Sequence, residues 1–133
     1  MKSGRYEEVT KEIQEINSTI KNVNPQAILK VIIECCLLSE SEKKEATKCV
    51  VNSGAEFVKT STGFAVSETG NGAKVEDVKL MLEIIKGTNT KIKAAGGIKS
   101  LQSALQFISL GVHRIGTSSG IQICENKVSD SNY

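Results

Sequence analysis

The sequence predicts an α/β fold in which parallel strands alternate with helices. Three observations predict it: short β-branched runs recur along the chain, segments with helical spacing of apolar residues separate them, and glycine-containing turns join the two. With 133 residues, the chain is long enough for one hydrophobic core but not for a two-domain enzyme. We therefore expect a single domain over residues 1–133, with a flexible tail from about residue 124 to the end.

The amino-terminal part of the chain predicts one helix followed by one strand. Within residues Tyr6–Val23 the apolar side chains recur every three or four positions among glutamates and lysines, which is the pattern of an amphipathic helix. The single proline, Pro25, separates this segment from the apolar run AILKVII at 27–33. That run is apolar on both faces except at Lys30, so we expect a buried parallel strand there.

The cycle of strand and helix continues along the rest of the chain. Ser39 and Glu42 have the spacing of a capping box, and Gly54 follows the helix that they predict. We expect helices at 40–52, 75–85 and 100–110, strands at 56–60, 91–95 and 112–115, and a last short helix after residues 116–120.

Alternation of this kind predicts a parallel sheet with right-handed crossovers, either open and doubly wound or closed as a barrel. Four strands do not close an eight-stranded barrel, which needs roughly 250 residues. A doubly wound sheet of about this length usually has a fifth strand. The sequence therefore predicts part of a larger arrangement of strands.

Composition excludes several classes of protein. The 17 Lys and Arg against 15 Asp and Glu give a net charge of +2, which is too weak for a nucleic-acid scaffold. We expect no membrane span, because no apolar run reaches about 18 residues, and a cytoplasmic location, because the first residues lack a signal-peptide pattern. The 4 cysteines lack CxxC spacing and there is 1 histidine, so we expect reduced, mostly buried thiols and neither a disulfide framework nor a metal site.

Two lysines near strand ends are the strongest candidates for chemistry. Lys59 lies near the carboxyl end of the strand predicted at 56–60, and Lys93 lies in the next strand. Sites form at this edge of parallel α/β sheets, and a lysine whose pKa is lowered by burial and a second cation attacks a carbonyl as the neutral amine. Neighbouring strands are about 4.8 Å apart, so the two lysines face each other if both point inward. The alternative is that each lysine reaches from a strand end to water.

Glycine turns after three strands predict a phosphate site. They are Thr62-Gly63, Gly96-Gly97 and the GTSSG motif at 116–120, which opens a helix. Glycine lets backbone N–H groups approach an anion, and a helix N-terminus adds partial positive charge. A single glycine pair is usually only a turn, whereas two such loops after consecutive strands favour a phosphate cradle.

Five motifs follow one another along the chain: KSG near the start, LKVIIE, FVKTSTGF, KAAGGI and RIGTSSG. In this order and spacing they resemble the carboxyl-terminal portion of the deoxyribose-phosphate aldolase family of class I aldolases. The resemblance extends from Lys2 to about Ile123, and its most specific parts are the lysine and Ser-Ser motifs. It implies half of a TIM-type β/α barrel, with four strands equivalent to strands five to eight.

The resemblance also implies an activity, namely reversible cleavage of 2-deoxy-D-ribose 5-phosphate to D-glyceraldehyde 3-phosphate and acetaldehyde, without a metal or other cofactor. The resemblance implies that Lys59 forms the Schiff base with the substrate. It also implies that Lys93 lowers the pKa of Lys59 and takes part in proton transfer. The residues implied to hold the substrate phosphate are Gly63, Gly96, Gly97, Lys99, Gly116, Ser118 and Ser119. Auxiliary candidates are Lys30, Glu34 and Tyr133; for Glu34, a structural pair with a lysine is an equal alternative.

The sequence departs from the family pattern, because it contains no match to strands one to four. The strand-end aspartate of the family's proton relay is missing with them, and neither Asp77 nor Asp130 occupies a matching position. A half barrel exposes two sheet edges and its inward side chains, so we expect a second copy, a separately encoded amino-terminal half or a rearranged sheet to cover them. Three functions stay open: an aldolase active alone, one piece of a split aldolase, and a phosphate-ester-binding remnant without turnover.

Overall fold

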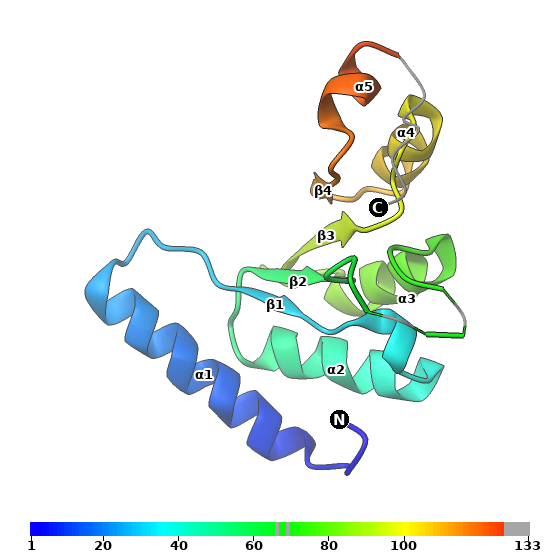
Figure 1. Cartoon of the computed structure of the whole chain (residues 1–133). Helices are drawn as coiled ribbons and strands as arrows, with labels where there is room; N and C mark the ends of the chain where they lie inside the picture. The colour runs from blue at the N-terminus through cyan, green and yellow to red at the C-terminus, as the bar shows by residue number, and fades with distance from the viewer. Residues whose placement is uncertain (66, 69, 127–133) are drawn as a thin grey trace.

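The computed structural model describes residues 1–65, 67–68 and 70–126, in which helices alternate with short parallel strands (Figure 1). The elements are α1 (Tyr6–Val23), β1 (Lys30–Ile32), the 3₁₀ turn η1 (Cys35–Leu37), α2 (Glu40–Asn52), β2 (Phe57–Lys59), α3 (Val75–Ile85), β3 (Lys91–Ala95), α4 (Leu101–Ser109), β4 (Arg114–Gly116) and α5 (Gly120–Cys124). The predicted alternation of strands and helices is confirmed.

Capping explains where two of the helices begin. Helix α2 follows a complete capping box: the Glu42 N–H donates to the Ser39 hydroxyl at 3.3 Å, and the Ser39 N–H donates to the Glu42 carboxylate at 2.8 Å. Ser100 and Ser103 form a second box before α4. The predicted bounds of α1, α2 and α3 agree with the structure to the residue.

The four strands form one parallel sheet in the order β1-β2-β3-β4. Strands that follow one another in the chain are therefore neighbours in the sheet, as in a barrel, whereas a doubly wound sheet reverses direction at a switch point. The half barrel is confirmed, and the open doubly wound alternative is wrong. Within the described residues, β1 and β4 each pair on one side only, so both edges of the sheet are open.

The hydrophobic core lies between the sheet and the helices that follow its strands. Val58, Ile92 and Ala94 on the middle strands are fully buried, and α2 and α3 supply the equally buried Val50 and Met81. In Figure 1 these two helices lie side by side below the strands. One face of the sheet is thus packed, which leaves the alternate side chains of each strand for the other face.

Strand β3 has its predicted bounds, the other three strands are shorter than the sequence predicts, and η1 is an element that the sequence does not predict. Strand β1 covers Lys30–Ile32 rather than 27–33, because only these residues pair in register with β2. Glu34 then leaves the extended conformation, with φ 51° and ψ 67°, and turns the chain into η1.

The structure also bears on the thiols and on the predicted tail. Cys35 and Cys49 are buried, Cys36 is half-buried and Cys124 is exposed, so the thiols are mostly but not all removed from solvent. Helix α5 ends at Cys124, and residues 127–133, which make up most of the predicted tail, lie outside the described part of the chain.

In the described residues, no helix combines the length and the apolar character needed to cross a membrane. The cytoplasmic location stays a prediction. Nor do three or more His, Cys, Asp or Glu side chains in those residues gather in a way that could hold a metal ion.

Candidate functional site

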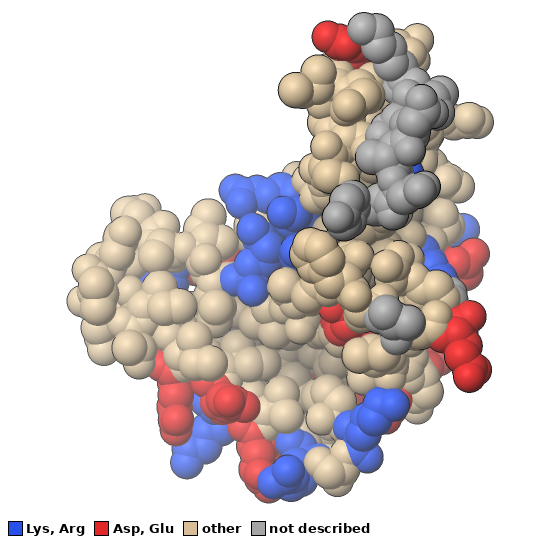
Figure 2. All heavy atoms as spheres, in the orientation of Figure 1, with Lys and Arg blue, Asp and Glu red and all other residues tan. Residues whose placement is uncertain are grey.

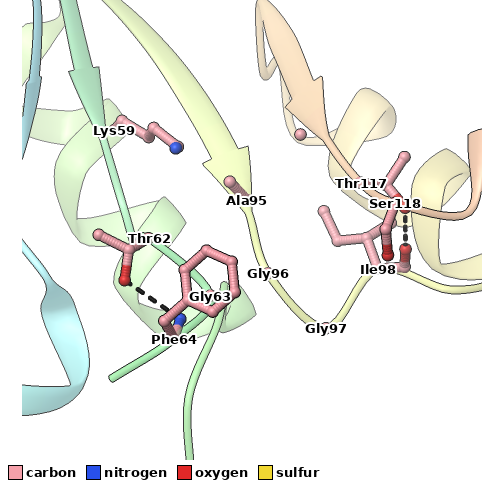
Figure 3. A pocket seen from close by; sticks show the side chains of 11 residues that line it. Lys59, Thr62, Gly63, Phe64, Ala95, Gly96, Gly97, Ile98, Thr117 and Ser118 are labelled. Carbon is pink, nitrogen blue, oxygen red and sulfur yellow. Dashed lines mark hydrogen bonds between the residues drawn. The ribbon is translucent and has the colours of Figure 1, made fainter. Parts of the chain in front are cut away.

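A pocket opens at the carboxyl ends of β2, β3 and β4, which is where the sequence predicts a site. Its volume is about 530 Å³. It is lined by Lys59, Thr62, Gly63, Phe64, Ala95, Gly96, Gly97, Ile98, Gly116, Thr117 and Ser118. Figure 3 shows Lys59 and Thr62 on one side of the pocket, Thr117 and Ser118 on the other, and the Gly96-Gly97 turn between them. Most of the predicted site residues are therefore brought together.

The two candidate lysines are neighbours in the sheet. Lys59 on β2 and Lys93 on β3 are register partners, and the same row continues to Arg114 on β4. The Lys93 side chain lies over Gly116, since a Cβ atom at Gly116 would stand 2.7 Å from Lys93 Cε and 3.3 Å from its Nζ. Glycine at this position thus leaves the space in which Lys93 approaches the pocket.

Positive charge gathers on the inward face of the sheet. Burial first, and then the charges of Lys30, Lys59 and Arg114, lower the pKa of Lys93 below its ordinary value. Lys30 and Arg114 also lie over the ring of Phe57, at 5.4 and 4.6 Å from its centre. Within the described chain, none of these four cations has a carboxylate at salt-bridge distance. Figure 2 shows Lys and Arg side chains gathered beside the strands.

The glycine turns pack backbone against backbone, which shapes the floor of the pocket. A Cβ atom on Gly96 would lie 2.7 Å from the Cα of Gly72 and 3.2 Å from the Cα of Gly63. Gly63, Gly96 and Gly97 all have positive φ, at 94°, 86° and 73°. The Ala73 N–H donates to the Gly96 carbonyl at 3.0 Å and holds the β2 loop on the β3 loop.

The loop after β4 is tied to the loop after β3 through Thr117. Its hydroxyl donates to the Ile98 carbonyl at 2.6 Å and accepts from the Ser119 N–H at 2.9 Å. Ser118 lines the pocket, whereas Ser119 is buried and Lys99 is half-buried, and neither lines it. The structure thus brings Ser118 to the pocket and leaves Ser119 and Lys99 beside it.

The auxiliary candidates have different positions. Lys30 belongs to the cation group described above, on the inward face of β1. The Glu34 carboxylate accepts hydrogen bonds from Thr62 in the pocket lining. Among the described residues no lysine lies at salt-bridge distance from it, so that part of the chain does not contain the lysine pair that was one of the two alternatives. Tyr133 lies outside the described residues.

Thr117 and Phe64 also line the pocket but are not among the predicted site residues, although both belong to motifs named above. Thr117 precedes the serine pair, and Phe64 follows Gly63. Their positions next to predicted phosphate-binding residues are the signal that could have identified them.

A protein-family model described as "DeoC/LacD family aldolase" matches residues 1–126 of this chain. The chain belongs to this family. It is 48% identical over 133 residues to a deoxyribose-phosphate aldolase of Carboxydothermus hydrogenoformans, covering 100% of this chain and 56% of the relative. It is 44% identical to the deoxyribose-phosphate aldolase of Staphylococcus carnosus over the same shares. The chain thus spans about half the length of the curated relatives that it matches.

Solved structures of the family have the same arrangement of strands and helices. "QR15, an Aldolase" is 44% identical with a TM-score of 0.79, covering 93% of this chain and 52% of that one. The tetrameric deoxyribose phosphate aldolase of Aeropyrum pernix is 30% identical with a TM-score of 0.78, covering 90% of this chain and 49% of that one. Both likenesses account for about half of the solved chain, which agrees with a half barrel.

Proposed function

We propose that this chain is the Schiff-base and phosphate-binding half of a deoxyribose-phosphate aldolase. The observation that carries the proposal is a pocket that Lys59, with a second lysine as its register partner, lines together with the glycine turns at three strand ends. The names of its relatives support the same substrate class. The proposed substrate is 2-deoxy-D-ribose 5-phosphate, and the products are D-glyceraldehyde 3-phosphate and acetaldehyde.

In the proposed reaction, the neutral amine of Lys59 adds to the aldehyde carbon of the open-chain sugar and water leaves, giving a protonated imine. The 3-hydroxyl then loses its proton and becomes a carbonyl as the C2–C3 bond breaks. The electron pair of the C2–C3 bond moves towards the imine and forms an enamine. Glyceraldehyde 3-phosphate departs, the enamine carbon takes up a proton, and water releases acetaldehyde and the free amine. Lys93, whose pKa is lowered, is the group that we propose exchanges these protons.

The phosphate is proposed to lie against the glycine turns that form the floor of the pocket. Gly63, Gly96, Gly97, Gly116 and Ser118 line the pocket, with Ser119 and Lys99 next to it. Backbone N–H groups that glycine leaves accessible are suited to an anion. Holding the phosphate there would direct the aldehyde end of the sugar towards Lys59.

A completing partner is part of the proposal, because the edge of β1 is open. The Ile33 N–H donates to the Lys59 carbonyl, so the odd-numbered residues of β1 turn their backbone groups to β2. The backbone groups of Lys30 and Ile32 therefore point to the open edge, where a further strand could pair. The side chain of Ile32 is 42% exposed beside it.

The charge of the inward face indicates what the partner brings. A second copy of the chain, placed face to face, would bring the same group of cations against Lys30, Lys93 and Arg114 and would be repelled. We therefore propose an amino-terminal half with carboxylates at its strand ends as the partner for this face. The tetrameric relative from Aeropyrum pernix supports self-association as a further part of the proposal.

The experiment measures release of acetaldehyde from 2-deoxy-D-ribose 5-phosphate by the purified chain, alone and mixed with the amino-terminal half of the Carboxydothermus hydrogenoformans relative. We expect the mixture to release acetaldehyde, and we expect no release when the Lys59→Met variant of the chain is used in the mixture. Release by the chain alone would make the partner unnecessary. Binding of inorganic phosphate by the folded chain without release in either sample would favour the non-catalytic remnant.

A further inference from the structure

Glu34 has an unusual backbone conformation at the carboxyl end of β1. Its φ of 51° and ψ of 67° lie in the left-handed region, which Glu34 shares only with Asn126 among the described residues other than glycine. A glutamate adopts this conformation at an energetic cost, so such a residue is kept where its surroundings hold it. The conformation directs the Glu34 side chain to the loop that follows the neighbouring strand β2.

The Glu34 carboxylate is bound to one residue of that loop. The Thr62 N–H donates to both carboxylate oxygens, at 3.2 and 3.0 Å, and the Thr62 hydroxyl donates to Oε2. The same hydroxyl accepts from the Phe64 N–H at 3.2 Å, a bond drawn in Figure 3. The chain of bonds from Glu34 through Thr62 to Phe64 thus fixes the turn that contains Gly63.

The turn lies in the pocket, whereas Glu34 does not. Thr62, Gly63 and Phe64 all line the pocket, and they follow Lys59 by only a few residues. Glu34 is not a pocket-lining residue, and the donors to its carboxylate are Thr62 and, at 4.0 Å, the Cys36 thiol. A proton-transfer role would need the carboxylate within reach of the reacting atoms. The contacts instead suit a group that holds the turn from outside.

We propose that Glu34 is a positioning residue, whose carboxylate sets the 62–64 turn so that Gly63 presents its backbone to the substrate phosphate. This inference rests on the proposed function for the phosphate but not on the imine chemistry. It makes recognition of a phosphorylated substrate depend on a residue of β1 that does not touch the substrate. Hydrogen bonds to a charged acceptor are the stronger kind, and this acceptor holds the turn through two donors.

The test uses Glu34→Gln, which retains the shape of the side chain but loses the charge. Its matched control is Glu12→Gln, the same change on an exposed face of α1. The first readout is the affinity for inorganic phosphate, measured by isothermal titration calorimetry on the wild-type chain and both variants. We expect Glu34→Gln to weaken phosphate binding about tenfold or more, while Glu12→Gln binds like the wild type.

Two variants of the partner residue separate positioning from folding. Thr62→Val removes the hydroxyl link, and Thr62→Ser retains it; we expect the first to weaken phosphate binding like Glu34→Gln and the second to restore it to within about threefold. The double variant Glu34→Gln with Thr62→Val should be little worse than either single change, because both break one chain of bonds. Faster hydrogen exchange of the Phe64 amide in Glu34→Gln would show the loosened turn directly.

Borohydride trapping with acetaldehyde, which has no phosphate, separates this proposal from the proposed function. We expect the loss of phosphate affinity in Glu34→Gln to exceed any loss of trapping at Lys59 severalfold. Equal losses would overturn the positioning role in favour of a direct part in the chemistry. Phosphate binding by Glu34→Gln equal to wild type, or none by the folded wild type, would also overturn it. Absence of trapping in the wild type, both alone and mixed with the amino-terminal half, with phosphate binding still sensitive to Glu34, would reject the proposed function alone.

Discussion

Replacing Gly116 by alanine tests whether glycine makes room for the second lysine. A Cβ atom at this position would stand 2.7 Å from Lys93 Cε and 2.8 Å from the Cβ of Ala95. Gly116 does not have a positive φ, so the backbone itself accepts alanine and only the contacts resist. The two contacts differ, because the end of a lysine side chain can swing away, whereas Ala95 is buried on β3.

The expected loss of stability in Gly116→Ala follows from this difference between the two contacts. Ala95 and Gly116 are register partners, so relief of the 2.8 Å contact with the Ala95 Cβ requires β3 and β4 to separate by several tenths of an ångström. Overpacking of this kind costs about 1–3 kcal/mol. Displacement of Lys93 from its position beside Lys59 should also slow borohydride-trapped imine formation at Lys59, by about tenfold or more, if Lys93 acts in proton transfer.

The assays are urea unfolding followed by circular dichroism, and trapping with acetaldehyde followed by intact mass. Gly120→Ala is the matched control, since its added Cβ meets nothing within 4 Å and the residue begins α5. That control should be neutral or more stable by up to about 1 kcal/mol. If Gly116→Ala matched Gly120→Ala in both stability and trapping rate, the argument that Gly116 accommodates Lys93 would be refuted.

Three further predictions concern charge and thiols. Burial and neighbouring cations lower the pKa of Lys93 in the folded protein below its pKa in the unfolded chain. Between these two pKa values the unfolded chain binds more protons, so the stability of the fold rises with pH there. At pH values below the pKa of Lys93 in the folded protein, the charge on Lys93 lowers the stability of the fold by its full amount. Lys93→Met should therefore stabilise the fold at pH 7, by up to about 1 kcal/mol, with the gain shrinking as the pH approaches 10.5; a gain that grows with pH in urea melts would contradict this. Asp77→Asn should cost about 3 kcal/mol, because it leaves Lys43, now 2.6 Å from the Asp77 carboxylate, largely buried without its partner; a loss below about 1 kcal/mol would show that the pair is not needed. Burial raises the pKa of Cys35 to about 12, so iodoacetamide at pH 8 should modify the exposed Cys124 at least a hundredfold faster than Cys35, and peptide mapping that finds equal rates would contradict the buried position.

The helices were the most predictable part of the fold, for local reasons. In α1 the apolar spacing, and in α2 the capping box of Ser39 and Glu42, lie within the helix or next to it, so the sequence alone contains them. The length of β1 depends on pairing with β2, which is a contact between distant segments. The order of the strands depends on the direction of every crossover, and a barrel and a doubly wound sheet share the same local pattern.

The candidate site divides in the same way. The positions of Lys59 and Lys93 near strand ends were sufficient to predict that they are neighbours if both point inward, and the parallel register makes them partners. The partner of Glu34 was not predictable, since it depends on a left-handed backbone and on a threonine 28 residues further along. The place of Lys99 outside the pocket lining also follows from how the loop after β3 packs, which residue type does not reveal.

Borohydride trapping of the folded chain with acetaldehyde tests the central claim most directly, with intact mass and peptide mapping as the readout. We expect one covalent ethyl adduct on Lys59, formed by the chain or by its mixture with an amino-terminal half, and lost in Lys59→Met. A control with Lys99→Met, a lysine beside the pocket, should retain the adduct on Lys59. No adduct in either sample, or an adduct that persists in Lys59→Met, would contradict the assignment of Lys59 as the Schiff-base residue.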